Sequence, residues 1–298
     1  MMDEDKPITE QANPRTKDID RLQSRSIIRL INDEDRNVAE AVYRALDRIA
    51  DAVDLTAERL RGGGHLFYIG SGTSGRLGVL DASECPPTFG VSPDLVRGII
   101  AGGPAALSRS IEGAEDDQEQ GGRDLEAAGL AEKDVLVGLS ASGTTPYTLG
   151  AIRYARRAGA ATISITCNPS SSLASAADVN IVVVVGPEVI AGSSRMKAGT
   201  AQKMVLNMIS TASMIRLGLV YGNLMSHLVA TNEKLKRRAI KIISSEAGLH
   251  PEEAASLFET AGDDLRIALV MAKRNIDKEE AAALLASHNG SVRRVLDE

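Results

Sequence analysis

Five short apolar segments, separated by stretches with helical periodicity, constrain the fold of this chain more than any other feature. They are His65–Ile69, Leu95–Ala101, Val135–Leu139, Ala161–Thr166 and Val179–Val185. Most of their residues are apolar without alternation, which is typical of strands that are buried on both faces. Strands that alternate with helices form βαβ units, so the sequence predicts an α/β fold with a five-stranded parallel sheet sandwiched by helices.

Helical patterns precede these strands. A polar segment to about Asp33 predicts an arm with one short helix over Ile19–Ile31, which we expect to lie on a partner subunit. From Val38 to Leu60, apolar residues recur at spacings of three, four or seven, and this predicts an amphipathic helix. The glycines of Gly62–Gly64 are a typical helix end.

Helical patterns also follow the strands, almost to the end of the chain. From about Leu224 they predict a small helical appendage. Within it, AASLFETAGDDLRIAL and AAALLASHNGSVRRVL align as a weak repeat, and each copy predicts a helix, a turn and the start of another helix. We therefore divide the chain into an N-terminal arm and helix over residues 1–54, an α/β domain over 55–218 and a helical C-terminal domain over 219–298.

Composition and charge exclude several classes of partner. The formal net charge is -6 and aromatic residues make up 3%, so the chain has neither the positive surface nor the stacking side chains that nucleic acid requires. The N-terminus lacks the basic-then-apolar order of a signal peptide, and no apolar run is long enough to cross a bilayer. Two cysteines, Cys85 and Cys167, suit a reducing compartment. We expect a cytoplasmic protein with no membrane partner.

The loop after the first strand, Gly70–Arg76, is rich in glycine and hydroxyl side chains. Small residues let a ligand approach the backbone, and the following helix start presents free amides to an anion. Its glycines match the dinucleotide spacing G-x-G-x-x-G, but no acidic residue clearly ends a second strand about twenty residues on, where a ribose would need one. Alone, the motif fits a tight structural turn as well as a phosphate site. The candidate ligands here are Ser71, Thr73 and Ser74.

Two further loops have similar chemistry. Ser140–Pro146 follows the third strand and opens a helix, and two such turns in one sheet indicate a phosphate bound by neutral donors and helix dipoles. Gly192–Thr200 opens another helix and adds two cations, which oppose the helix dipole and so favour a bound anion. A basic helix start on the surface is the alternative. The candidates in these loops are Ser140, Ser142, Thr145, Ser193, Ser194, Arg195 and Lys197.

These motifs carry a family resemblance. The pattern Ser-x-Ser-Gly-x-Thr after a strand, with the upstream Gly-Thr-Ser loop, resembles the sugar isomerase (SIS) domain. More narrowly, YIGSGTSGRLGVLDASECPPTFG, IEGAEDD and GSSRMKAGTAQK resemble the bacterial N-acetylmuramic acid 6-phosphate etherases, as do TEQANPRTKDID and INDEDRNVAEAV near the N-terminus. The similarity covers nearly the whole chain. Thr144 departs from it, since many relatives carry arginine there, which puts one anion contact in doubt.

The resemblance implies cleavage of the lactyl ether of N-acetylmuramic acid 6-phosphate, with neither a metal nor a nicotinamide cofactor. It assigns Glu84 as the acid that assists lactate departure and Glu115 as the base at the second sugar carbon. The sequence supports Glu84 independently, because the small and apolar residues and the double proline around it predict a packed helix end, where burial favours a protonated acid. The alternative is an exposed carboxylate. For Glu115, in an acidic stretch, the residues alone favour a solvated helix face.

Two other functions share the same loops. A sugar-phosphate isomerase would use them with an acid–base pair but would release no lactate, and a regulatory SIS protein would only sense the phosphosugar. The presence of both Glu84 and Glu115 in etherase-like contexts favours the enzyme. SIS domains generally pair, so the resemblance also implies a homodimer with two equivalent sites.

Overall fold

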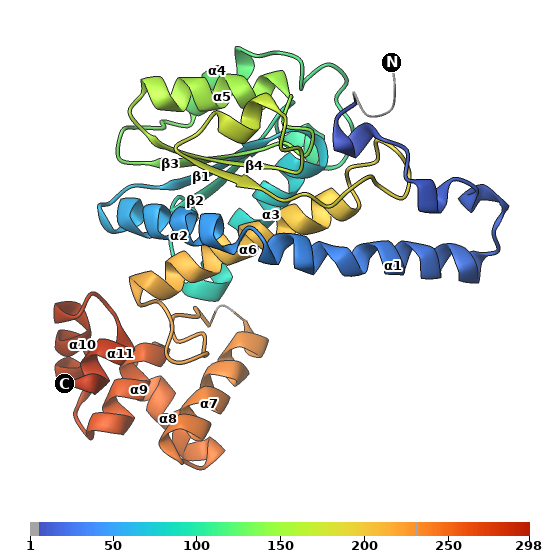
Figure 1. Ribbon diagram of the computed structural model, residues 1–298. Helices are drawn as coiled ribbons and strands as arrows, with labels where there is room; N and C mark the ends of the chain where they lie inside the picture. Colours follow the sequence, from blue (N-terminus) through green and yellow to red (C-terminus); the bar gives the residue numbers. More distant parts are fainter. Residues whose placement is uncertain (1–5, 231) are drawn as a thin grey trace. The chain divides into compact units, whose positions relative to one another are not determined.

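The computed structural model describes residues 6–230 and 232–298 (Figure 1). The first five residues of the expected arm therefore lie outside the described residues. The chain divides into two compact units, Met1–Ser83 with Pro93–Thr211, and Glu84–Ser92 with Ala212–Glu298. Among the helices of the described ranges, none has the length and apolar character needed to cross a membrane.

The first unit contains the predicted parallel sheet. Its strands are β1 (Leu66–Gly70), β2 (Val96–Ile100), β3 (Val135–Leu139), β4 (Ala161–Thr166) and β5 (Val179–Val182), in the spatial order β2-β1-β3-β4-β5. All neighbouring pairs are parallel, which confirms the predicted fold class. The three central strands are buried along their whole length, whereas the edge strands β2 and β5 are partly exposed, because each has a neighbour on one side only.

Helices cover both faces of the sheet (Figure 1). The helices α4 (Gln120–Ala127) and α5 (Pro146–Arg157) lie on one face, and α2 (Leu46–Arg61) and α3 (Gly72–Phe89) lie on the other. Alternate residues of each strand supply the two cores. Phe67 and Ile69 of β1 pack with Tyr147 of α5, while Tyr68 points the other way, so that a Cβ on Gly78 of α3 would lie 2.9 Å from Tyr68 Cβ.

The N-terminal helices differ from the prediction. The expected helix over Ile19–Ile31 is a 3₁₀ turn, η4 (Ile19–Arg21), followed by the longer helix α1 (Ser24–Tyr43). The single helix predicted from Val38 to Leu60 is broken between Tyr43 and Leu46, where α1 ends and α2 begins. No glycine or proline marks this break. The apolar periodicity continues across it. Of the periodic residues, Val38, Val42, Ile49, Val53 and Leu60 are buried, whereas Leu46 is exposed.

The second unit is helical, as predicted. It contains α7 (Glu233–Ala247), α8 (Pro251–Thr260), α9 (Leu265–Arg274), α10 (Lys278–Ser287) and α11 (Val292–Asp297) around a buried cluster that includes Phe258 and Leu269. The weak sequence repeat corresponds to α8–α9 and α10–α11. In each copy the turn has backbone with positive φ, at Asp263 in the first and Asn289 in the second, and a side chain caps the next helix.

Candidate active site

The loops after β1 and β3 meet at the point where the chain reverses its direction across the sheet. From β1 the chain passes through α3 to β2 on one side, and from β3 it passes through α5 to β4 on the other. In open parallel sheets, ligands bind outside the carboxyl ends of the two strands at such a point. The topology therefore places the two hydroxyl-rich loops side by side, at the ends of the neighbouring strands β1 and β3.

The first loop is a tight turn into α3. A Cβ on Gly75 would lie 2.5 Å from the Gly70 carbonyl oxygen, so packing alone explains that glycine. Ser71 and Thr73 are partly buried. Ser74 is buried, and its hydroxyl donates to Gln202 Oε1 at 2.9 Å. Of the three candidates in this loop, Ser74 thus has its hydroxyl engaged inside the protein.

Ser140 organises the second loop. Its Oγ lies 2.8 Å from Thr145 Oγ1 and 3.3 Å from Ser142 Oγ, and it accepts the Gly143 amide at 3.0 Å. Gly143 has φ +71, a conformation that favours glycine. At Thr144, which departs from the family pattern expected from sequence, the exposed hydroxyl donates to Ser142 Oγ at 3.1 Å. The loop is thus shaped by its own hydroxyls, with Ser142 and Thr145 both in contact with Ser140.

We expect Ser140→Ala to destabilise the protein and to weaken substrate binding together. The buried Gly143 amide loses its acceptor, which costs about 1–3 kcal/mol of unfolding free energy. Loss of the loop geometry should also raise KM. Denaturant unfolding and steady-state kinetics measure both effects, with Ser256→Ala, at an exposed serine of α8, as the control. Wild-type stability in Ser140→Ala would contradict the proposed role of its hydroxyl.

Glu115 lies beside both loops. Ser71 Oγ donates to Glu115 Oε2 at 2.9 Å, and the Glu115 carbonyl accepts the amide of Tyr147, in the first turn of α5, at 3.1 Å. The segment around it is a turn, so the solvated helix face that the residues alone favoured is wrong, although the side chain is exposed. Ser71, Arg76 and Glu115 line a cavity of about 280 Å³. Glu115 therefore lies between the end of β1 and the start of α5.

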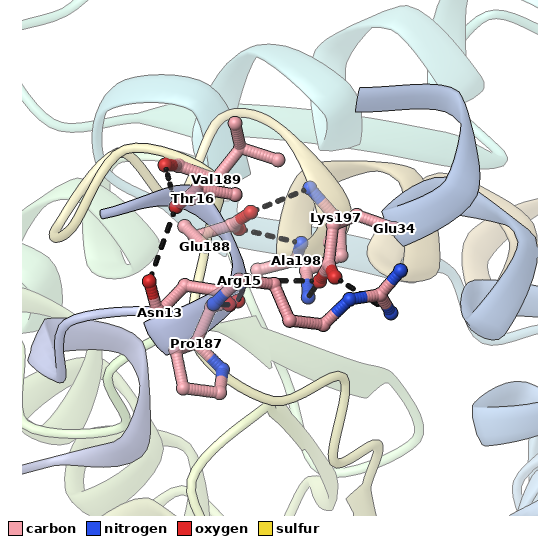
Figure 2. A network of polar contacts seen from close by, with 9 residues as sticks. All are labelled: Asn13, Arg15, Thr16, Glu34, Pro187, Glu188, Val189, Lys197 and Ala198. Carbon is pink, nitrogen blue, oxygen red and sulfur yellow. Dashed lines mark hydrogen bonds and ion pairs between the residues drawn. The ribbon is translucent and has the colours of Figure 1, made fainter. Parts of the chain in front are cut away.

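The third loop leads into α6 (Lys197–Leu217), whose first amides are already occupied. Glu188 accepts the amide of Lys197 at 3.0 Å and that of Ala198 at 2.9 Å, and Lys197 Nζ lies 2.7 Å from Glu34 Oε2 (Figure 2). The sequence predicted that this basic helix start attracts an anion, and the anions in contact with it are Glu188 and Glu34. Burial raises the pKa of Glu188, and the two amides act against that rise.

The start of α6 also packs on the first loop. A Cβ on Gly199 would lie 3.3 Å from Thr73 Cγ2, and Gln202 holds Ser74. Ser193 and Ser194 are partly buried and Arg195 is exposed. Sequence reasoning missed Glu34, Glu188 and Gln202, because no local spacing distinguishes them from other polar residues. Their roles depend on partners that are far away in the chain.

Glu84 lies on α3, about three turns or about 18 Å of helix axis beyond Gly72. The sequence predicted that it is buried at a packed helix end, and this is wrong in the single chain, where the Glu84 side chain is exposed. Pro86 and Pro87 do not end the helix next to it, since α3 continues to Phe89. The exposed carboxylate of Glu84 is open to a partner or to solvent.

The described residues contain no cluster of metal ligands. No three His, Cys, Asp or Glu side chains among residues 6–230 and 232–298 gather as metal ligands would. Cys167 is fully buried, and burial together with Glu188 raises the pKa of its thiol to about 12. Its predicted role as a small packing residue is confirmed.

Comparison with known proteins adds the following similarities. The chain is 51% identical over 294 residues to an N-acetylmuramic acid 6-phosphate etherase from Clostridium botulinum, covering 99% of this chain and 97% of that protein. It is 51% identical to N-acetylmuramic acid 6-phosphate etherase 1 from Bacillus licheniformis, covering 97% and 95%. The glucokinase regulatory protein N-terminal SIS domain family matches residues 48–156, and the SIS domain family matches residues 118–212. A solved phosphoheptose isomerase from Neisseria gonorrhoeae, 16% identical, shares the fold with a TM-score of 0.50 over 64% of this chain and 98% of that one.

Proposed function

Because the chain belongs to the N-acetylmuramic acid 6-phosphate etherases, we propose that Glu84 and Glu115 are the two proton-transfer residues of its active site. The enzyme is a carbon–oxygen lyase. It cleaves the lactyl ether of N-acetylmuramic acid 6-phosphate and yields N-acetylglucosamine 6-phosphate and D-lactate, a step in the recycling of cell-wall amino sugars.

The reaction needs an acid and a base because an ether oxygen is a poor leaving group. Opening of the sugar ring exposes an aldehyde, which acidifies the proton on the second carbon. Glu115 first removes that proton, and Glu84 then protonates the lactyl oxygen as its bond to the third carbon breaks. Glu84, now a carboxylate, then takes a proton from water as the water oxygen adds to the third carbon of the alkene. Glu115 then returns a proton to the second carbon, and a hydroxyl group from water has replaced the lactyl group.

The hydrogen bond from Ser71 to Glu115 is the observation that supports this assignment most directly. It holds the proposed base at the carboxyl edge of β1, beside a helix start that suits a phosphate. A base must lie within hydrogen-bonding reach of the proton it abstracts, and a phosphate bound at this edge would bring the sugar carbons to Glu115.

The phosphate ligands that we propose come mainly from the first two loops. Ser71 and Thr73 at the start of α3, and Ser140, Ser142 and Thr145 before α5, present hydroxyls beside two helix N-termini. Neutral donors and helix dipoles of this kind bind anions without a buried cation. The overall negative charge of the chain is therefore compatible with a phosphorylated substrate.

From the third loop we assign Ser193, Ser194 and Arg195 to the anionic groups of the substrate. For Ser74 and Lys197 the contacts favour a supporting role, since both side chains are buried and bind side chains far away in the sequence, Gln202 and Glu34. We place the enzyme in the cytoplasm, which suits its two buried thiols.

We further propose a homodimer in which each site combines Glu115 of one subunit with Glu84 of the other. The stretch of α3 between the first loop and Glu84 is about 18 Å long, more than the distance from the phosphate to the third carbon of the sugar. A two-fold partner offers a second copy of the exposed Glu84.

Mixing two inactive variants tests this arrangement. Glu84→Gln and Glu115→Gln, co-expressed with different tags, form hybrid dimers in which one of the two sites has both carboxylates. Random pairing should restore about a quarter of the wild-type rate of lactate release. Hybrid dimers that are isolated through both tags and remain inactive would show that each chain supplies both glutamates to its own site.

A further inference from the structure

We propose that Glu34 is a positioning residue for the loop Gly192–Met196, which it holds from both ends through Lys197 and through the N-terminal arm. The proposal rests on the function assigned above to this loop as a ligand of the substrate. Glu34 lies in α1, and no sequence motif connects it with the loop Gly192–Met196. Figure 2 shows Glu34 with Lys197, Glu188 and the arm residues Asn13, Arg15 and Thr16.

At the C-terminal end of the loop, Glu34 binds Lys197. Lys197 Nζ donates to Glu34 Oε2 at 2.7 Å, and the two side chains are 2% and 5% exposed. Glu188 fixes the same residue through the backbone, because it accepts the amides of Lys197 and Ala198 (Figure 2). Lys197, which directly follows the loop, is thus held through both its backbone amide and its ammonium group.

At the other end, the arm binds the segment that leads into the loop. The Gly192 amide donates to the Thr9 carbonyl at 3.1 Å, and Thr16 Oγ1 donates to the Val189 carbonyl at 2.7 Å. Asn13 Nδ2 reaches the Pro187 carbonyl at 3.3 Å. The arm, expected from sequence to lie on a partner subunit, makes these contacts within its own chain.

Glu34 joins the two ends. Besides Lys197, its carboxylate accepts Asn13 Nδ2 at 3.0 Å and pairs with Arg15 Nη1 at 3.1 Å. Burial acts to raise the pKa of Glu34, but the hydrogen bonds and charges of Lys197, Asn13 and Arg15 outweigh it and lower the pKa. An ionised Glu34 therefore binds the arm and the start of α6 at the same time.

The charge on Glu34 matters because Lys197 occupies an unfavourable position for a cation. It lies at the N-terminus of α6, where the helix dipole repels positive charge, and its ammonium is shielded from water. Without an anion at position 34, the ammonium would be driven toward solvent. A cavity of about 500 Å³ next to Glu34 and Lys197 gives it room to move, and the loop would lose its anchor.

The test separates positioning from stability with three variants, Glu34→Gln, Lys197→Met and the double variant. Removing one partner of a buried ion pair destabilises a protein, whereas replacing both is often neutral. We expect the double variant to recover the melting temperature of wild type. Its KM for N-acetylmuramic acid 6-phosphate should stay raised by about tenfold or more, with kcat within about threefold.

Hydrogen exchange and two control variants complete the test. In the double variant, the Gly192 amide should exchange faster than in wild type, while β3 amides should not. Glu40→Gln, on the same helix and bonded to Arg44, should match wild type throughout. A double variant with wild-type KM and Gly192 exchange would overturn the proposal. If Arg195→Ala leaves KM unchanged, the function assigned to the loop fails instead, whatever the Glu34 variants do.

Discussion

We expect Glu84→Gln to slow lactate release strongly while leaving hydrogen exchange at the second sugar carbon intact. The amide keeps the size and polarity of the carboxyl group but cannot protonate the departing lactyl oxygen. General acid catalysis typically contributes about 10²–10⁴-fold, and release should fall by that factor. Incubation of N-acetylmuramic acid 6-phosphate with the variant in deuterated water, followed by mass spectrometry and a lactate assay, measures both steps in one sample.

The control for Glu84 is Glu58→Gln, which removes an exposed helical carboxylate from α2 and should behave as wild type. Loss of exchange along with lactate release in Glu84→Gln would show that Glu84 acts at the second carbon. An unchanged rate of release would remove Glu84 from the mechanism and would contradict the division of roles between the two glutamates.

Glu115→Gln should lose both exchange and release, by about 10²–10⁴-fold, because proton removal from the second carbon precedes the departure of lactate. The amide oxygen can still accept the hydrogen bond from Ser71, so the loop should keep its geometry. Circular dichroism and the melting temperature check that it does. The same deuterium and lactate assays measure the chemistry.

Glu119→Gln is the matched control, because Glu119 is also exposed and belongs to the same acidic stretch. It should retain wild-type rates. If Glu119→Gln is as inactive as Glu115→Gln, the charge of the whole stretch matters more than one base. If Glu115→Gln still exchanges deuterium, the base lies elsewhere and the contact with Ser71 serves only to hold the turn.

Both predictions concern side chains that are exposed in the single chain. Exposed carboxylates make weak catalysts in water, since proton transfer is most effective when the pKa is matched to the reaction and water is excluded. The proposed dimer would enclose both groups, which gives a physical reason why activity should depend on assembly. Dilution below the dimer dissociation constant should then lower the specific activity.

The local pattern of the sequence was sufficient to predict the strands and the order of elements. Runs such as Val135–Leu139 are apolar without alternation, and only a position between two layers of helices buries both faces of such a strand. The same reasoning failed at the boundary between α1 and α2. Apolar periodicity reports which face is buried, and it continues across a break that no glycine or proline marks.

The candidate site was predictable in its composition but not in its connections. The hydroxyl-rich loops after β1 and β3 could be read directly, because the turn from a strand into a helix is a local structure. The sequence could not show which of these hydroxyls bind groups inside the protein. The hydroxyl of Ser74, for example, binds Gln202 of α6, which is 128 positions away.

By itself, therefore, the sequence determined the α/β class, the buried strands and the chemistry of the loops, because each depends on neighbouring residues. Only the tertiary structure decided that Glu115 meets Ser71, 44 residues away, and that Lys197 is neutralised by Glu34, 163 residues away. Contacts of this kind depend on how the strands are ordered and how the arm returns to the sheet. No local pattern of side chains encodes that order. The sequence could therefore predict that the cations at the start of α6 attract an anion, but not that Glu34 of the same chain supplies it.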